Sequence, residues 1–173
     1  MRCVTQDGRQ ITLRSLEPED LDFLYRMEND TELWGVANTS VPYSRYVLHD
    51  YIANATDDIY RDGQVRLVVE TDGMAVGMVD IFDFNPQHRR AELSIVIDAR
   101  YRKRGIATAV VCAMAGYACH TLRLHQLYAV VAEDNEASLS LFLRCGYVRN
   151  GVMKDWLYDG KRYVNAVMLH KIF

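Results

Sequence analysis

A strand, a basic turn and an apolar helix follow one another between residues 89 and 118, and this order limits the fold more than any other feature of the sequence. Residues 89–98, RRAELSIVID, alternate with period two, which predicts a strand with two unlike faces. One face carries Ala91, Leu93, Ile95 and Ile97, and the other carries Arg90, Glu92, Ser94 and Val96. A helix is predicted from Gly105, with apolar residues at helical spacing: Ala107, Val110, Val111, Met114 and Ala118.

The turn between this strand and helix is strongly basic, with Arg102, Lys103 and Arg104 before Gly105. The amide end of a helix already carries partial positive charge, so these cations oppose the usual preference for acids there. Helix-start amides bind phosphate oxygens, and a glycine lets such a ligand approach the backbone closely. The turn therefore indicates an anion site, with a solvated basic turn as the alternative.

The composition restricts the class of partner. A chain of 173 residues suits one domain, spanning 1–173, and the net charge of −3 does not favour a nucleic-acid partner. A local basic cluster in an acidic protein favours a small anionic ligand instead. No apolar run suggests a secretion signal or a membrane span, and the four cysteines form no C-x-x-C pair. These features predict a cytoplasmic protein with reduced thiols and no membrane partner.

The rest of the chain continues the alternation of strands and helices, as in an α/β or α+β domain. Further strands are predicted at 9–16, 64–71, 74–84 and 125–133, with two more around Asp159–Gly160 in 147–173. Further helices are predicted at 17–30, from Ser44 to Tyr51 and at 135–147. Counting the strand and helix above, the sequence predicts seven strands and four helices.

Several motifs together resemble the GNAT superfamily of N-acetyltransferases. The pattern Arg102-x-x-Gly105-x-Ala107 after an apolar strand is similar to the pyrophosphate-binding signature of that family. The segment NEASLSLFLRCGY at 135–147 resembles its late motif, and LRSLEPEDLDFL at 13–24 resembles its first strand and helix. The segments HRRAELSIVID and DWLYDGKRYVNAVML are similar to the branch with spermidine N-acetyltransferase and the ribosomal-protein N-terminal acetyltransferases.

The resemblance implies a mixed seven-stranded sheet flanked by four helices, in which the fourth and fifth strands splay apart near Ile97 and Val130. It also implies acetyl-CoA as cofactor, with pantetheine in that gap. The pantetheine would bond the backbone of Ile95, Val96 and Ile97, as an added strand bonds a free sheet edge. The diphosphate would lie on the turn formed by Arg102, Lys103, Arg104, Gly105, Ile106 and Ala107. Asn135 would bond the pantetheine, with helix capping as a second role, and Ser138 would lie near the sulfur.

The implied reaction is acetyl transfer to a primary amine, and the amide of Ile97 or Val96 would polarise the thioester oxygen. Spermidine acetyltransferases carry a tyrosine at the position of Phe142, and that tyrosine protonates the leaving sulfur. Phenylalanine has no proton to give, so water, Ser138, Cys145 and Tyr147 remain as alternatives. Phe142 itself would pack against the cofactor arm.

Carboxylates among apolar residues are candidates for the base, since such surroundings raise a pKa. Glu92 is expected in a base or substrate role, and Asp80 and Asp83 in substrate binding. The alternative for each is a cross-strand ion pair, for which Arg89 and Arg90 are near in sequence.

Trp34 and Tyr43 lie in the loop that helps form the acceptor site in this family, whereas Trp156 and Tyr158 are expected in packing or an interface. The histidines show no metal-ligand spacing, so no metal site is expected.

The acceptor is left open. A small-molecule amine, including a polyamine such as spermidine, is the first hypothesis. The loop VANTSVPY at 36–43 lacks the acidic residues that the resembling enzymes have there, which weakens the spermidine hypothesis. A protein N-terminus and a CoA-binding sensor with little turnover are the alternatives. A homo-oligomer also remains open.

Overall fold

The computed structural model describes residues 1–31, 33, 41–56 and 58–173, and its centre is one eight-stranded mixed sheet. In chain order its strands are β1 (Arg2–Val4), β2 (Gln10–Arg14), β3 (Val65–Thr71), β4 (Met74–Asn85), β5 (Arg90–Ile97), β6 (Gln126–Ala132), β7 (Val148–Tyr158) and β8 (Tyr163–Ile172). Their order across the sheet is β1-β2-β3-β4-β5-β6-β8-β7.

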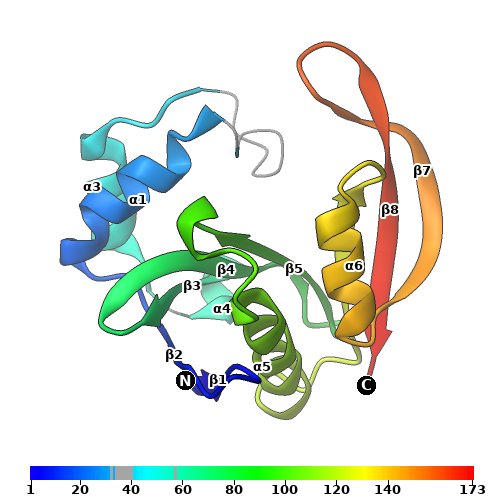
Figure 1. Ribbon diagram of the computed structural model, residues 1–173, viewed down its shortest axis with the longest axis horizontal. Helices are drawn as coiled ribbons and strands as arrows, with labels where there is room; N and C mark the ends of the chain where they lie inside the picture. Colours follow the sequence, from blue (N-terminus) through cyan, green and yellow to red (C-terminus); the bar gives the residue numbers. More distant parts are fainter. Residues whose placement is uncertain (32, 34–40, 57) are drawn as a thin grey trace.

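Helices cover both faces of this sheet. The described α-helices are α1 (Leu21–Glu28), α3 (Arg45–Asn54), α4 (Ile59–Asp62), α5 (Ile106–His120) and α6 (Glu136–Arg144). Two 3₁₀ turns, Pro18–Asp20 and Ala99–Tyr101, precede α1 and α5. In Figure 1, α1 and α3 lie above the β3–β5 part of the sheet and α5 lies below it.

The predicted fold class is confirmed, with small differences in the count of elements. The sheet has eight strands rather than seven, because β1 is a three-residue strand too short to show a period. The four-residue helix α4 was also not predicted. That residues 1–173 form one domain stays a prediction. Within the described part of the chain, no helix has the length and apolar character needed to cross a membrane.

The predicted separation of two central strands is present between β5 and β6. This parallel pairing joins Arg90, Ala91 and Glu92 to Gln126, Leu127 and Tyr128, and it ends there. Beyond that point β5 stays paired with β4 as far as Ile97, while β6 stays paired with β8 as far as Ala132. The two strands therefore part just after Glu92, and a free backbone edge opens on each side.

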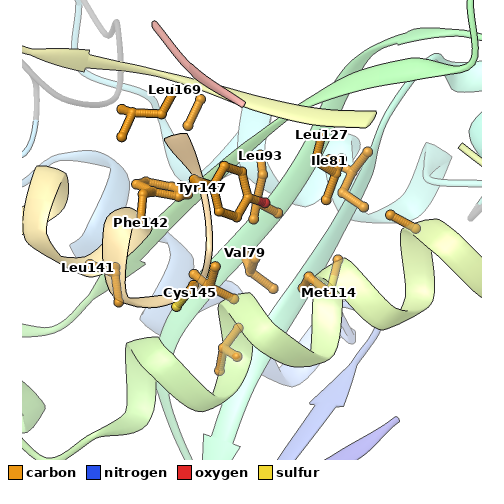
Figure 2. Packing of buried hydrophobic residues seen from close by; sticks show 14 of the residues in the cluster. Val79, Ile81, Leu93, Met114, Leu127, Leu141, Phe142, Cys145, Tyr147 and Leu169 are labelled. Atoms are coloured by element: carbon orange, nitrogen blue, oxygen red, sulfur yellow. The ribbon is translucent and has the colours of Figure 1, made fainter. Parts of the chain in front are cut away.

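Two hydrophobic cores hold the layers together. The larger core packs the odd-numbered side chains of β5 and β6 against α5 and α6, and Figure 2 shows Leu93 and Leu127 close to Met114 in this core. The smaller core lies on the other face, where α1 and α3 cover Val68 and Met78. The even-numbered residues of β5 and β6 consequently face the side of the sheet that carries α1.

The hairpin of β7 and β8 extends as a long arm beyond the other strands (Figure 1). The predicted turn at Asp159–Gly160 is present: Gly160 has a φ of +93°, and the Asp159 carboxylate accepts the N–H of Lys161 at 2.8 Å. A register shift interrupts the pairing between Met153 and Leu157 on β7. Asp155, inside that bulge, has a φ of +49°.

Candidate active site

A cavity of about 550 Å³ opens where β5 and β6 part. It extends from α1 across the sheet to the start of α6 and the β7–β8 arm. The residues expected in the site that line it are Asp80, Glu92, Ile95, Val96, Asn135, Ser138 and Phe142. Residues that the sequence predicted for the site, on β4, on β5 and at α6, therefore line one cavity.

The basic turn leads into the uncapped end of α5. Gly105 is the N-terminal cap residue, with a φ of +74°, and no side chain caps the helix. The first N–H groups of a helix have no intrahelical acceptor, so those at Ile106 and Ala107 are available to an anion. Arg102, Lys103 and Arg104 around them are exposed. This arrangement fits the diphosphate that the sequence predicts.

The free edge of β5 fits the amides of a pantetheine arm. The Asp98 N–H donates to Val76 O at 2.9 Å, so the backbone groups of even-numbered residues here are directed toward β4. Successive residues direct their backbone groups to alternate sides, so those of Ile95 and Ile97 are directed to the opened side, and those of Val96 are directed toward β4. The carbonyl of Ile97 already accepts a bond from Nε of Arg102 at 2.9 Å. The Ile97 N–H, rather than that of Val96, is therefore directed toward the gap.

Glu92 lies at the point where the two strands part. Burial raises the pKa of its carboxyl to about 7, and the charge of Asp83 acts in the same direction. The nearby Val130 N–H and Tyr128 hydroxyl oppose this rise in the pKa. A carboxyl group with a pKa near 7 can accept a proton at neutral pH and release it again. Glu92 therefore has the properties of a general base.

Asp83 and Tyr128 stand beside Glu92. A bulge between Phe82 and Asn85 gives Asp83 a φ of +47°, and its carboxylate accepts the hydroxyl proton of Tyr128. Burial and this bond raise the pKa of Tyr128, so the phenol stays protonated. Asp83 is exposed, whereas Tyr128 lines the cavity. Tyr128 was missed from the sequence because its segment was interpreted only as a buried strand.

Asp80 forms an ion pair on the cavity floor. Nε of Arg66, its cross-strand neighbour, lies 2.7 Å from Oδ1 of Asp80, and a second guanidinium nitrogen lies 2.6 Å from Oε1 of Glu28. The hydroxyl of Ser94 also donates to Asp80, at 3.4 Å. The ion pair considered as the alternative for Asp80 is thus present, but its partner is Arg66 rather than Arg89 or Arg90.

The start of α6 places three predicted residues along the opposite wall. The side chain of Asn135 caps this helix by accepting the Ser138 N–H at 3.1 Å, and Ser138 is half-buried. Phe142 is buried and packs edge-to-face on Tyr147, with ring centroids 5.0 Å apart. These positions leave the amide of Asn135 and the hydroxyl of Ser138 at the cavity.

Two of the candidate acids for the leaving sulfur lie in the large core instead. Figure 2 shows Cys145 and Tyr147 among apolar side chains between α5 and the sheet. Burial raises the pKa of Cys145 to about 12 and also raises that of Tyr147. Neither lines the cavity, which leaves Ser138 as the side chain of the three that does.

The described part of the loop before α3 includes Tyr43, one of the two residues expected at the acceptor site. The backbone of Tyr43 is held by Asn29, whose side chain bonds its N–H at 2.8 Å and its carbonyl at 3.0 Å. The cavity lining within the described residues does not include Tyr43. Trp34 lies outside the described residues. Trp156, expected in packing or an interface, instead lines the cavity from β7.

Comparison with known proteins agrees with this geometry. A family model described as Acetyltransferase (GNAT) domain matches residues 10–148. The spermidine N(1)-acetyltransferase of Escherichia coli is 29% identical over 166 residues, which are 94% of this chain and 86% of that protein. These matches confirm the resemblance and the branch proposed from the sequence.

Solved structures show the same fold. The crystal structure of spermidine N-acetyltransferase from Vibrio cholerae in complex with CoA and spermine has a TM-score of 0.84 at 27% identity, covering 94% of this chain and 95% of that one. A dodecameric structure of the enzyme from Vibrio cholerae has a TM-score of 0.78 at 27% identity, covering 94% and 93%. The expectation of an acetyl-CoA-dependent acetyltransferase is confirmed at the level of the family. The chain belongs to the GNAT family of acetyltransferases.

Proposed function

We propose that this protein transfers the acetyl group of acetyl-CoA to the primary amine of a small molecule. The observation that carries the proposal is the position of Glu92, a carboxyl with a pKa of about 7 at the mouth of the gap between β5 and β6. The cavity of about 550 Å³ beside it has the size of a small-molecule site.

Two different segments of the chain would bind the two ends of the cofactor. The amides and cations from Arg102 to Ala107 would hold the diphosphate, and the backbone of Ile95 and Ile97 would hold the pantetheine, with Asn135 on the far side of the gap. Bound there, acetyl-CoA supplies an activated acetyl thioester whose carbon bonds to the amine nitrogen while the thiol of CoA leaves.

The residues near the cavity would then transfer the protons and stabilise the developing charge. Glu92 takes the proton that the amine nitrogen loses, directly or through water. The Ile97 N–H donates to the acetyl oxygen, where negative charge develops. Ser138 or water returns a proton to the sulfur, because Phe142 carries none. A CoA thiol leaves readily, so this weak acid slows the reaction without preventing it.

The relatives indicate which amine to test first. The relatives named above are spermidine acetyltransferases, and one was solved with spermine. Their names make a polyamine the first acceptor to test. A protein N-terminus is the alternative within the same chemistry, and a CoA sensor with little turnover is the alternative outside it.

Self-association belongs to the same proposal. The β7–β8 arm exposes large apolar side chains, among them Val148, Val152, Tyr158 and Tyr163. Apolar side chains on an exposed edge strand are typical of surfaces that pair with another copy. A related enzyme forms a dodecamer. We expect an oligomer in solution, which light scattering on the eluted protein measures directly.

A thiol-release assay tests the function. The protein is incubated with acetyl-CoA and a panel of amines that includes spermidine, simple monoamines and a short peptide with a free N-terminus. Release that depends on an amine supports the proposal, and Glu92→Gln should remove most of it while Glu19→Gln, an exposed site in the turn before α1, should not. CoA binding without release on any amine would support the sensor instead.

A further inference from the structure

We propose that the acceptor is a small primary amine with a single positive charge and an apolar body, rather than a polycation. This inference rests on the function proposed above and names the class of its substrate. It follows from the charges and the apolar walls of the cavity, taken together with a bulge that turns one aromatic side chain into it.

Two of the acidic groups at the cavity, Glu28 and Asp80, already share one cation. Arg66 bridges Glu28 at 2.6 Å and Asp80 at 2.7 Å, and the side chains of these acids are only 10% and 18% exposed. The contact with Asp80 uses two guanidinium nitrogens, since a second one reaches Oδ2 at 3.2 Å. Drawing either acid toward a substrate cation would weaken its contact with the largely buried guanidinium, which offsets the new contact. Both acids are therefore poor partners for a second ammonium group.

The remaining acids at the cavity, among the described residues, form one cluster rather than a row. Asp83 is bonded to the hydroxyl of Tyr128, and Tyr128 lies opposite Glu92 in the strand pairing. A polyamine needs carboxylates spaced along its length, because its ammonium groups are separated by several carbons. The carboxylates of Glu92 and Asp83 can bind one cation, next to the position where the amine must lose its proton.

Much of the rest of the described lining is apolar, with Gln64 and Ser94 as polar side chains among it. The apolar part includes thioethers, aliphatic groups and rings: Met27, Leu33, Met78, Phe82, Met153, Trp156, Leu157 and Met168. Thioether side chains adapt their shape to an apolar ligand and make favourable contacts with aromatic rings. Such a lining stabilises a hydrocarbon body and supplies no carboxylate to a second ammonium group.

A bulge in β7 directs Trp156 into this lining. In a regular strand Trp156 and Leu157 would face opposite sides, but both line the cavity. The register shift between Met153 and Leu157 and the φ of +49° at Asp155 account for this, and Asn165 fixes the bulge by accepting the Asp155 N–H at 3.0 Å. Bulges beside binding sites commonly redirect a side chain in this way. Trp156 remains 60% exposed, which leaves its ring free to contact a ligand.

The charges also disfavour an acceptor that carries its own carboxylate. The cation lining the cavity, Arg66, is already bonded to two carboxylates, and Glu92 and Asp83 lie close by. An amino acid would therefore place its carboxylate beside groups of the same sign. The corresponding amide keeps the amine and the side chain and removes that repulsion.

Steady-state thiol release with four amines tests the inference: 2-phenylethylamine, spermidine, L-phenylalaninamide and L-phenylalanine. We expect kcat/KM for 2-phenylethylamine to exceed that for spermidine by at least about tenfold, and the amide to exceed the free amino acid by a similar factor. Trp156→Ala should lower kcat/KM for 2-phenylethylamine by about tenfold, mainly through KM, and Trp156→Phe should restore most of it.

Tyr46→Ala is the control, because Tyr46 is an aromatic side chain that is 80% exposed on α3 and does not line the cavity. It should leave kcat/KM unchanged. The inference is wrong if spermidine equals or exceeds 2-phenylethylamine, or if the two alanine variants behave alike. Preference for a longer peptide over the amide would also overturn it, in favour of a protein N-terminus. Failure of every amine to release thiol would instead overturn the proposed function itself.

Discussion

Replacing Glu92 with glutamine should make the protein less active and, at high pH, more stable. Burial raises the pKa of Glu92 from 4.5 to about 7, so the folded protein holds this proton more tightly than the unfolded chain. The carboxyl therefore costs no stability below about pH 4.5, costs progressively more as the pH rises to 7, and costs the full amount above that. Glutamine has the same shape and no charge, so the variant avoids the cost.

The size of the effect follows from the same pKa. The difference between 4.5 and about 7 would correspond to about 3 kcal/mol if it were fully converted, at about 1.4 kcal/mol for each pH unit. The carboxyl is only half-buried and solvent screens it, so we expect about 1 kcal/mol at pH 8.5. In a protein of this size that raises the melting temperature by about 3 °C.

Denaturant unfolding at pH 4.5 and pH 8.5 measures the stability, and thiol release with a saturating amine measures the activity. Glu92→Gln should match the parent protein at the lower pH and exceed it at the higher one. Its kcat should fall by about 100-fold or more, the usual effect of removing a general base, and the inflection of kcat near pH 7 should disappear. A variant that is less stable at both pH values, or that keeps the inflection, would refute this view of Glu92.

Three other substitutions have clear expectations. Tyr147→Phe removes a buried hydroxyl that has no partner among the described residues, so denaturant unfolding should show equal or slightly higher stability, by up to about 1 kcal/mol, and thiol release should not change. Asn135→Ala removes the cap of α6, so stability should fall by about 1 kcal/mol and the KM for acetyl-CoA should rise. Arg66→Met leaves the largely buried Glu28 and Asp80 without their cation, so denaturant unfolding should show a stability lower by about 3 kcal/mol.

The sequence was sufficient to predict those elements whose structure depends on contacts between residues close together in the chain. The period of residues 89–98 predicted β5, and the turn after it predicted the start of α5, because both depend on neighbours within a few residues. The sequence also identified Glu92 as a carboxylate in an apolar strand, although Asp83, Tyr128 and Val130 on other strands form its surroundings in the fold.

Contacts between distant segments were not predictable in this way. Arg66 joins Glu28 and Asp80 from three different elements, and nothing in the sequence near any of them identifies the other two. The bulge that turns Trp156 into the cavity depends on the pairing of β7 with β8, which a single strand does not reveal.

One alternative for the acid was wrong for a related reason. α6 stops at Arg144, and Cys145 caps the helix and packs into the core instead of lining the cavity with Ser138.

Calorimetric titration of CoA tests the central claim, that the turn opening α5 holds the diphosphate. The parent protein should give saturable heat, and Gly105→Glu should abolish it by placing a charge against the phosphates. Gly151→Glu makes the same change in open space on β7 and should leave the affinity unaltered. No heat from the folded parent protein at millimolar CoA, or equal affinity in Gly105→Glu, would contradict the claim.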